Sequence, residues 1–400
     1  MFTKRIKRLA VIFLIPLLIL QLGFSHALAS DVGGDSGDGT VATQESAPSL
    51  DLNCKSAILI EATTGKVLYE QNADEALPPA SVTKVMTLLL VMEAIDEGKI
   101  KLDDMVSTSA HAASMGGSQI FLEEGEQMSV EDMLKSVIIA SANDAACALA
   151  EFVSGSEEAF VARMNERASE LGMQNTTFEN TNGLDDTAQN HLTSARDIAI
   201  MSAELIKHEK ILEYSSIWMD TIRNGEFGLT NTNRLVRFYK GCTGLKTGST
   251  AKAGFCISAT AERDGTKLVA VIMGAESRDI RNAAATKLLD WGFANFGVYT
   301  HAGEELDGIK TIGGVKNSLK AECAEFSCVL EKSKVSKVEY KLELPSEISA
   351  PIKKGDVVGK VVFTLDGEEI GKADVVAAEN IDKIGFFEVW CRILAKFLLK

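Results

Sequence analysis

The sequence is poor in the residues that bind metal ions in enzymes. Its 400 residues include only five histidines and seven cysteines, the histidines are scattered, and no two cysteines form a Cys-x-x-Cys pair. Zinc sites need several such ligands at close spacing. We therefore expect no metal hydrolase, and we predict no metal site and no cofactor. Because seven is an odd number, the cysteines also cannot all pair with one another in disulfide bonds.

Positive charge is scarce as well. The chain carries 41 lysines and arginines against 56 aspartates and glutamates, a formal net charge of -15 at pH 7. Binding to the phosphates of nucleic acid requires a basic surface, so nucleic acid is excluded as a partner. Hydrophobic residues make up 46 % of the sequence, enough to fill the cores of two or three domains in a chain of this length.

The N-terminus has the three parts of a secretory signal peptide. Four basic residues come first: Lys4, Arg5, Lys7 and Arg8. The apolar run Leu9–Leu22 follows and is shorter than the roughly 20 residues that a membrane span needs. Ala27-Leu28-Ala29 then offers a small-x-small cleavage site. We expect residues 1–29 to be removed on export, the alternative being a retained anchor, and residues 30–50 to form a flexible leader.

Strand patterns occur at both ends of residues 51–299, with helical patterns between them. The segments with strand character are Ala57–Ile60, Val67–Glu70, Leu245–Thr250, Gly254–Ala261 and Lys267–Met273. Thr64-Gly65 predicts a hairpin between the first two, and Arg263-Asp264-Gly265 predicts a tight turn between the last two. Asp279–Phe296 is then helical. We expect an α+β domain, an antiparallel five-stranded sheet flanked by helices with a helical subdomain.

The last hundred residues change character twice. Residues 300–379 contain short strand patterns separated by Pro, Gly and Asp, which predicts a small all-β domain. In residues 380–400, polar residues recur every four positions and so share one helix face: Glu388, Arg392, Lys396 and Lys400. Most other positions there are apolar, but no apolar run exceeds three residues. We expect an amphipathic helix that lies in the membrane interface, the alternative being a helix docked on its own domain.

Ser81-Val82-Thr83-Lys84 opens a predicted helix that runs through Ile95 to Gly98. Residues three apart on a helix share one face, so Lys84 can reach the Ser81 hydroxyl. A serine becomes nucleophilic when a neighbour takes its proton, and a lysine can do so only when it is uncharged. The pattern alone is weak, because Ser249 and Lys252 have the same spacing and a helix N-cap would explain Ser81 equally well.

Two further short patterns carry polar groups. Ser141-Ala142-Asn143 lies between two predicted helices, where a hydroxyl and an amide can relay a proton and hold a substrate amide. Helix capping by the same residues is the alternative. Lys246-Thr247-Gly248 lies on a predicted strand. Its charge and hydroxyl suit a carboxylate, and its glycine lets a ligand approach the backbone, although an exposed lysine before a strand bend is also consistent.

The order and surroundings of these motifs resemble the serine D-alanyl-D-alanine carboxypeptidases, the low-molecular-mass penicillin-binding proteins. In that family Ser-x-x-Lys, Ser-x-Asn and Lys-Thr-Gly follow one another along a catalytic domain with a β-lactamase/transpeptidase-like fold. The flanking residues also match: Pro78-Pro79-Ala80, Ala140, Asp144-Ala145 and Ala253-Gly254-Phe255. The resemblance covers roughly residues 50–300, and the β domain and amphipathic tail also look like the family.

The resemblance implies a role for each motif residue. Ser81 forms an acyl-enzyme with the penultimate D-alanine of a peptidoglycan stem peptide, and Lys84 is its general base. Ser141 and Asn143 assist proton transfer and orient the substrate. Lys246 and Thr247 of the Lys246-Thr247-Gly248 strand grip the terminal carboxylate, helped by Arg278 or Arg281. The backbone N–H groups of Ser81 and Ser249 form the oxyanion hole. The resemblance also implies that β-lactams trap Ser81 and that the enzyme works on the outer face of a bacterial cytoplasmic membrane.

Three alternatives remain. A class A-like serine β-lactamase shares the motifs but needs a Glu-x-x-Leu-Asn pattern, and the single Leu-Asn here, Leu52-Asn53, precedes Ser81. A DD-endopeptidase acting on cross-linked muropeptides would use the same site. A non-catalytic wall-binding protein is disfavoured, because every chemically required residue is present.

Overall fold

The computed structural model describes residues 50–186 and 188–398. The predicted signal peptide and nearly all of the predicted leader lie outside the described residues, as do Lys400 and Leu399 at the C-terminus.

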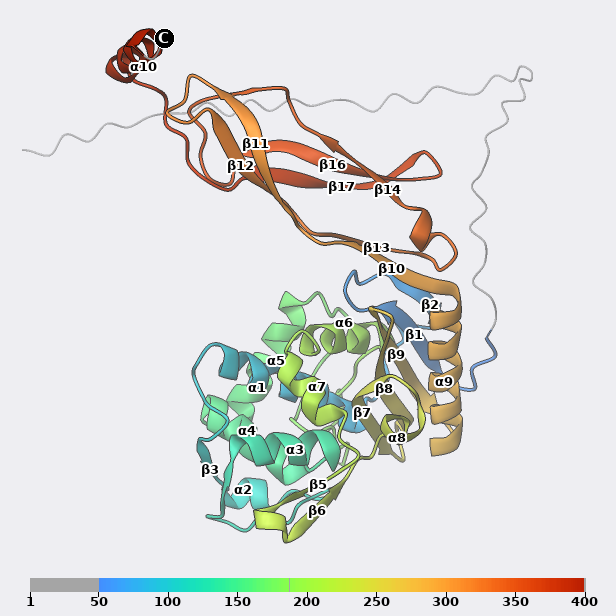
Figure 1. Ribbon diagram of the computed structural model, residues 1–400. Helices are drawn as coiled ribbons and strands as arrows, with labels where there is room; N and C mark the ends of the chain where they lie inside the picture. The colour runs from blue at the N-terminus through green and yellow to red at the C-terminus, as the bar shows by residue number, and fades with distance from the viewer. Residues whose placement is uncertain (1–49, 187, 399–400) are drawn as a thin grey trace, which may run out of the picture. The chain divides into compact units, whose positions relative to one another are not determined.

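A five-stranded antiparallel sheet organises the first of two folded regions, with the strand order β2-β1-β9-β8-β7 (Figure 1). The strands are β1 (Ser56–Glu61), β2 (Val67–Gln71), β7 (Cys242–Thr250), β8 (Gly254–Arg263) and β9 (Thr266–Ala275). The predicted sheet is thus confirmed, including the turn between β8 and β9. Asp264 and Gly265 both have positive φ there, 50° and 76°, as a two-residue hairpin turn requires.

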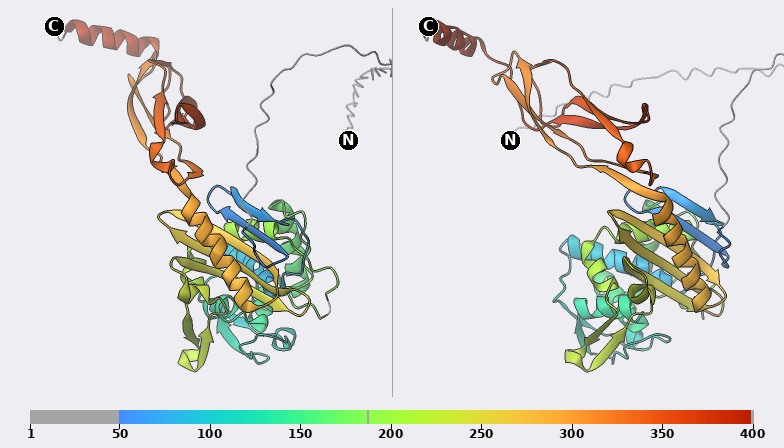
Figure 2. Two further views of the ribbon diagram at one scale, coloured as in Figure 1. Left: turned by 90° about the vertical axis from the view of Figure 1, so that its right-hand side faces the viewer. Right: turned by 45° about the vertical axis from the view of Figure 1, so that its right-hand side comes forward.

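Successive residues of the sheet face two different cores. Ile58 and Ile60 pack with helices on one side, whereas Ala57 and Leu59 pack on the other. Helix α9 (Arg278–Asn295) covers one face of the sheet (Figure 2) and shares a core with Leu59, and the helical subdomain covers the opposite face. Because both faces are buried, the strands carry apolar runs and not a strict polar alternation.

The helical subdomain lies between β2 and β7 in sequence. Its helices are α1 (Lys84–Asp96), α2 (Ala110–Ala113), α3 (Val130–Ile139), α4 (Asn143–Ser154), α5 (Glu157–Glu170), α6 (Ala195–Leu205), α7 (Glu209–Ser215) and α8 (Leu235–Phe238), with the 3-10 turns η1 (Ala80–Thr83) and η2 (Arg223–Gly225). Two small antiparallel sheets of two strands complete it: β3 (Met105–Ser107) with β4 (Gln127–Ser129), and β5 (Met219–Ile222) with β6 (Phe227–Thr230). The sequence analysis did not predict these strands, since three or four residues are too few to establish a period.

The second folded region is the predicted small β domain. Its elements are β10 (Phe296–His301), β11 (Glu305–Ile312), β12 (Ser318–Cys323), β13 (Phe326–Glu331), η3 (Val335–Lys337), β14 (Glu339–Glu343), β15 (Ile348–Ser349), β16 (Val357–Leu365) and β17 (Glu368–Ala377). Six strands form one sheet, and β10 pairs with β13. Phe363 is fully buried at the centre and stacks on Phe326 with ring centroids 4.1 Å apart.

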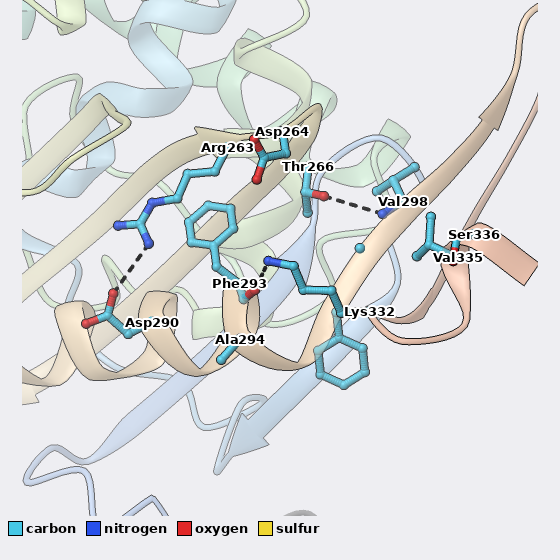
Figure 3. Close-up of a pocket in the computed structure, with 12 residues that line it drawn as sticks. Arg263, Asp264, Thr266, Asp290, Phe293, Ala294, Val298, Lys332, Val335 and Ser336 are labelled. Carbon is cyan, nitrogen blue, oxygen red and sulfur yellow. Dashed lines mark hydrogen bonds and ion pairs between the residues drawn. The ribbon is translucent and has the colours of Figure 1, made fainter.

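The β10–β13 hairpin is joined to the end of α9. Lys332 donates to the carbonyl of Phe293 at 2.9 Å, which places a cation at the negative end of the helix (Figure 3). The Val298 amide donates to the Thr266 hydroxyl at 3.3 Å. A pocket of about 450 Å³ lies between these contacts and the ion pair of Arg263 with Asp290.

The C-terminal helix α10 (Phe386–Leu398) begins later than the sequence predicted. Residues 381 and 383 instead form β-bridges to the β domain, which keeps that stretch extended. Arg392 donates to the Gly314 carbonyl and to the Asn317 side chain, so this part of the polar face is turned toward the β domain. The described part of the chain contains no helix with the length and apolar character needed to cross a bilayer.

Candidate active site

Ser81 lies in the 3-10 turn η1 and not, as predicted, in the first turn of the α-helix. Pro79 precedes the turn, Ala80 has a left-handed φ of +48°, and α1 begins only at Lys84. In a 3-10 turn the side chains of residues i and i+3 are nearly eclipsed. The turn therefore brings Ser81 and Lys84 together more directly than an α-helix would.

The Lys84 amine has three oxygen neighbours. Its Nζ lies 3.0 Å from Ser81 Oγ, 2.6 Å from Asn143 Oδ1 and 2.8 Å from the carbonyl oxygen of Asn182. Asn143 also donates through Nδ2 to the Gly116 carbonyl at 2.7 Å, which fixes its amide oxygen toward Lys84. An uncharged amine has two N–H donors and one lone pair. It can donate to the two fixed acceptors and keep the lone pair for the Ser81 hydroxyl proton.

Burial favours this uncharged form of Lys84. The side chain is fully buried, and desolvation lowers its pKa well below the usual 10.5. The positive charge of Lys246 lowers the pKa further, while the carboxylate of Asp144 opposes both effects. The site thus places a hydroxyl beside an amine whose uncharged, basic form is favoured, the pairing that activates a serine nucleophile.

The second motif forms the junction between α3 and α4. Ser141 has a positive φ of +65° and is buried, and Asn143 is the first residue of α4. The neighbouring carboxylate of Asp144 accepts hydrogen bonds from the backbone amides of Ile120 and Leu122. This anchors the loop that carries Gly116, the partner of the Asn143 amide.

The third motif passes directly over the 3-10 turn η1 (Ala80–Thr83), which carries Ser81 and is called the nucleophile turn below. A Cβ atom built on Gly248 of β7 would lie 2.8 Å from both the Pro79 carbonyl oxygen and the Ser81 backbone nitrogen. Only glycine allows this approach, which brings Thr247 and Ser249 beside Ser81.

Two cations in this part of the site are buried, Lys246 of β7 and Arg281 of α9. Lys246 donates to the Thr247 carbonyl at 2.9 Å, and burial together with the charge of Arg281 lowers its pKa to about 7. Arg281 is itself 3 % exposed, and desolvation lowers its pKa to about 10. Arg278 is exposed at the start of α9. Both arginines line the pocket at Ser81, but Arg281 is the one whose charge acts on Lys246.

A pocket of about 350 Å³ opens at Ser81. The site residues identified from the sequence that line it are Ser81, Ser141, Thr247, Gly248, Ser249, Arg278 and Arg281. Lys84 contacts Ser81 and is in turn bonded to Asn143, and the buried Lys246 is close enough for its charge to lower the Lys84 pKa. The structure therefore brings all three motifs to one site.

Several pocket residues were missed by the sequence analysis. They are Ser118, Trp218, Thr230, Asn231, Thr232 and Arg234. Thr232 accepts a hydrogen bond from the Thr247 hydroxyl at 2.8 Å. Asn182 was missed as well, because its contact with Lys84 uses a backbone carbonyl, which no side-chain pattern reveals.

Three side chains of metal-ligand type come together elsewhere in the described chain. The ligand atoms of His111, Cys147 and Glu151 lie within 4.8 Å of one another. None of the three lines the pocket at Ser81. His111 is bonded to Glu157 at 2.7 Å, and burial raises the pKa of the Cys147 thiol and keeps it protonated. We assign these residues no part in the chemistry at Ser81.

Comparison with known proteins gives consistent matches over most of the chain. The sequence model of peptidase family S11, described as D-alanyl-D-alanine carboxypeptidase, matches residues 41–277. The model of the penicillin-binding protein 5 C-terminal domain matches residues 299–383. The D-alanyl-D-alanine carboxypeptidase DacF of Bacillus subtilis is 46 % identical over 339 residues, which cover 83 % of this chain and 87 % of the relative.

Solved structures share the fold. Penicillin-binding protein 5 of Haemophilus influenzae has a TM-score of 0.71 at 34 % identity, covering 83 % of this chain and 98 % of that one. Penicillin-binding protein D2 of Listeria monocytogenes, solved in its ampicillin-bound form, has a TM-score of 0.57 at 33 % identity and covers 62 % of this chain and all of its own. The family match spans more than half of the chain and includes all three motifs. The chain belongs to the D-alanyl-D-alanine carboxypeptidases of peptidase family S11.

Proposed function

We propose that the enzyme removes the terminal D-alanine from peptidoglycan stem peptides through an acyl-enzyme on Ser81. The single observation that carries the proposal is the environment of Lys84 Nζ, whose two fixed acceptors leave its lone pair directed at Ser81 Oγ. Lys84 takes the hydroxyl proton while Oγ bonds to the carbonyl carbon of the penultimate D-alanine. The peptide C–N bond then breaks, and the leaving amine takes a proton, with Ser141 and Asn143 assisting.

The remaining groups of the site stabilise two negative charges: the terminal carboxylate of the substrate and the oxyanion that forms during the reaction. The backbone N–H groups of Ser81 and Ser249 stabilise the oxyanion of the tetrahedral intermediate. Lys246, Thr247 and Arg281 bind the terminal carboxylate, which is the feature that distinguishes a carboxypeptidase substrate. The burial of both cations supports this assignment, because an anion of the substrate would compensate their charge. Arg278 contributes at the exposed side of the same pocket.

Water then hydrolyses the Ser81 ester and restores the hydroxyl. A β-lactam follows the same reaction steps, beginning when Ser81 attacks and opens its strained ring. Because the leaving group of the opened ring stays attached, the ester on Ser81 persists. The ampicillin-bound form of the Listeria relative supports this expectation.

Two measurements test the function. Intact and peptide mass spectrometry after benzylpenicillin treatment should find one adduct, on Ser81, and none in Ser81→Ala with retained fold. Product analysis on a pentapeptide ending in D-Ala-D-Ala should find free D-alanine. Release of muropeptides from cross-linked dimers in place of D-alanine would identify a DD-endopeptidase and overturn the proposal.

The location of the enzyme is a second part of the proposal. The N-terminal signal pattern directs export, and α10 then binds the outer face of the cytoplasmic membrane. Supporting this, large apolar side chains of α10 are exposed, among them Phe386 at 89 %, Phe387 at 73 % and Phe397 at 80 %. So broad an exposed apolar face suits the interface of a bilayer. Sedimentation with lipid vesicles tests this part, and loss of residues 386–400 without loss of sedimentation would overturn it.

A further inference from the structure

A chain of three hydrogen bonds runs beneath the nucleophile turn. The backbone N–H of Glu179 donates to Nδ1 of His191 at 3.0 Å. His191 Nε2 lies 2.7 Å from the hydroxyl of Thr83, and that hydroxyl donates to the carbonyl of Ala80 at 2.8 Å. His191 and Thr83 are both buried, and they are 108 positions apart in the sequence.

The direction of this chain is determined by its first bond. Because Nδ1 accepts the Glu179 amide, the ring proton must be on Nε2. The ring is neutral, since burial lowers the His191 pKa to about 4, although the carboxylates of Glu179 and Asp185 act in the opposite direction. Nε2–H therefore donates to Thr83 Oγ1, and the Thr83 proton is left to point at the Ala80 carbonyl.

The Ala80 carbonyl belongs to the same peptide group as the Ser81 N–H. A peptide group is planar, so a fixed carbonyl direction also fixes the N–H on its opposite side. This peptide follows a residue with a φ of +48°, a conformation that non-glycine residues adopt only when their surroundings enforce it.

Close contacts on both sides enforce this conformation. A Cβ on Gly183 would lie 1.9 Å from the Ala80 oxygen and 2.8 Å from the Thr83 hydroxyl, so the loop backbone confines the carbonyl side. On the other side, the Ser81 nitrogen borders Gly248 of β7, where a Cβ would lie 2.8 Å away. Both glycines are thus required for the peptide to be held at this position.

We propose that His191 and Thr83 are positioning residues that orient and polarise the Ser81 N–H as an oxyanion donor. The inference rests on the proposed function, in which this N–H stabilises the tetrahedral intermediate. Hydrogen bonds in a chain strengthen one another, so donation into the Ala80 carbonyl makes the Ser81 N–H of the same peptide a stronger donor. An oxyanion donor acts only when charge develops, so the effect belongs to the transition states and not to substrate binding.

The test uses mass spectrometry to follow how the covalent benzylpenicillin adduct of the enzyme forms and disappears. It yields three constants: the dissociation constant K of the noncovalent complex, the acylation rate constant k2 and the deacylation rate constant k3. Thr83→Val keeps the side-chain shape but removes the donor to Ala80. We expect k2 and k3 to fall together by about 10- to 100-fold while K changes by less than about threefold, because both chemical steps pass through an oxyanion. Thr83→Ser, which restores the hydroxyl, should recover both constants to within about threefold.

Thr87→Val is the matched control. Thr87 is equally buried one turn further along α1, and its hydroxyl donates to the Thr181 carbonyl at 2.6 Å without touching Ala80. It should lose a similar amount of thermal stability and keep k2. Should Thr83→Val not fold, His191→Phe serves instead, because it keeps the ring beside Phe178 but cannot donate to Thr83. We expect a smaller fall in k2 and k3 there, about 3- to 10-fold.

Two outcomes would overturn the inference: acylation by Thr83→Val within threefold of the wild type, or an equal loss of k2 in Thr87→Val. Mapping the wild-type adduct separates this failure from failure of the proposed function. A wild-type adduct away from Ser81 removes the proposed function itself. An adduct on Ser81 with unchanged k2 in folded Thr83→Val removes only the positioning role.

Discussion

The Lys84 amine and the Asn143 amide oxygen lie 2.6 Å apart, although 59 positions separate them in the sequence. The contact joins the first two motifs into one unit, because Asn143 is turned toward Lys84 by its bond to the Gly116 carbonyl. It also means that Asn143 supplies a neutral acceptor where a charged one would disturb the base. An amide oxygen accepts a hydrogen bond from the amine without favouring its protonated form as strongly as a carboxylate would.

Asn143→Asp should therefore move the pH dependence of acylation. A carboxylate at 2.6 Å from Nζ stabilises charged Lys84 and raises its pKa, so the neutral base forms only at higher pH. Opposite charges at such distances shift a pKa by about 1–3 units, so acylation at pH 7 should fall at least about tenfold and recover as the pH rises. The measurement is k2 for benzylpenicillin between pH 6 and pH 10.

Asn143→Ala is the control for this shift. It removes the acceptor without adding charge, so acylation should fall at every pH without an alkaline displacement of the profile. If acylation by Asn143→Asp also falls equally at every pH, Lys84 is not the group whose titration limits acylation.

Lys246 should limit activity on the alkaline side. Its pKa of about 7 means that the positive charge for the substrate carboxylate is lost as the pH rises above 7. The charge of Arg281 contributes to this low value, so removing it raises the Lys246 pKa and extends the charged form to higher pH. In Arg281→Met we therefore expect the alkaline limb of the pH profile of kcat/KM, measured with a D-Ala-D-Ala peptide, to shift to higher pH.

Arg278→Met provides the comparison, since Arg278 is exposed in the same pocket and does not contribute to the lowering of the Lys246 pKa. The alkaline limb of the kcat/KM profile of Arg278→Met should stay at the same pH as in the wild type. An identical displacement in both variants would mean that the limb reports general loss of positive charge and not the titration of Lys246.

The motifs were predictable because their chemistry depends on side chains at fixed short spacing. Ser81 with Lys84, and Asn143 with Ser141, are local patterns, and the order of the motifs along the chain identified the fold. The sheet was predictable from its apolar runs and from the Asp264-Gly265 turn. These features are properties of consecutive residues, which is what a sequence displays.

The rest of the site depends on contacts between distant segments. Asn182 meets Lys84 through a carbonyl group, and His191 meets Thr83 across 108 positions. A histidine in a polar loop carries no sign that it will be buried there. The 3-10 turn at Ser81 was likewise missed, because the left-handed conformation of Ala80 is held by the close approach of Gly183 and not by any local preference of alanine.

His191 should make the protein less stable in acid. Its pKa is about 4 in the folded protein, against 6.5 when unfolded, so between these values the unfolded chain binds a proton that the folded one does not. Stability therefore falls as the pH falls through this window, by up to about 3 kcal/mol. Urea unfolding at several pH values should show this decrease, and His191→Gln should lack it. A parallel decrease in both proteins would assign the acid sensitivity to other groups.

Gly248→Ala should abolish the fit between β7 and the nucleophile turn. The added Cβ would lie 2.8 Å from backbone atoms of Pro79 and Ser81, which cannot move aside as a flexible side chain would. A displacement of about 1 Å at the reacting group can cost about 100-fold, and we expect k2 to fall by that order. Gly228→Ala is the control, because a Cβ there would meet no atom within 4 Å. Equal losses in the two variants would contradict the proposed steric cause.

Membrane binding should depend on the apolar face of α10 and not on the catalytic site. Trp390 is 54 % exposed and Phe397 80 % exposed, so replacing both with serine removes apolar surface without leaving a cavity. The double variant should sediment with anionic phospholipid vesicles at least about tenfold less than the wild type, because each large apolar side chain contributes about 1.5–3 kcal/mol when buried. Cleavage of a soluble pentapeptide should be unchanged.

Arg392→Gln tests the alternative that charge alone binds the helix to the membrane surface. Arg392 already donates to the Asn317 side chain, so its loss should weaken vesicle binding far less than the loss of the two aromatic residues. Binding that follows Arg392 and ignores Trp390 and Phe397 would contradict the interfacial helix.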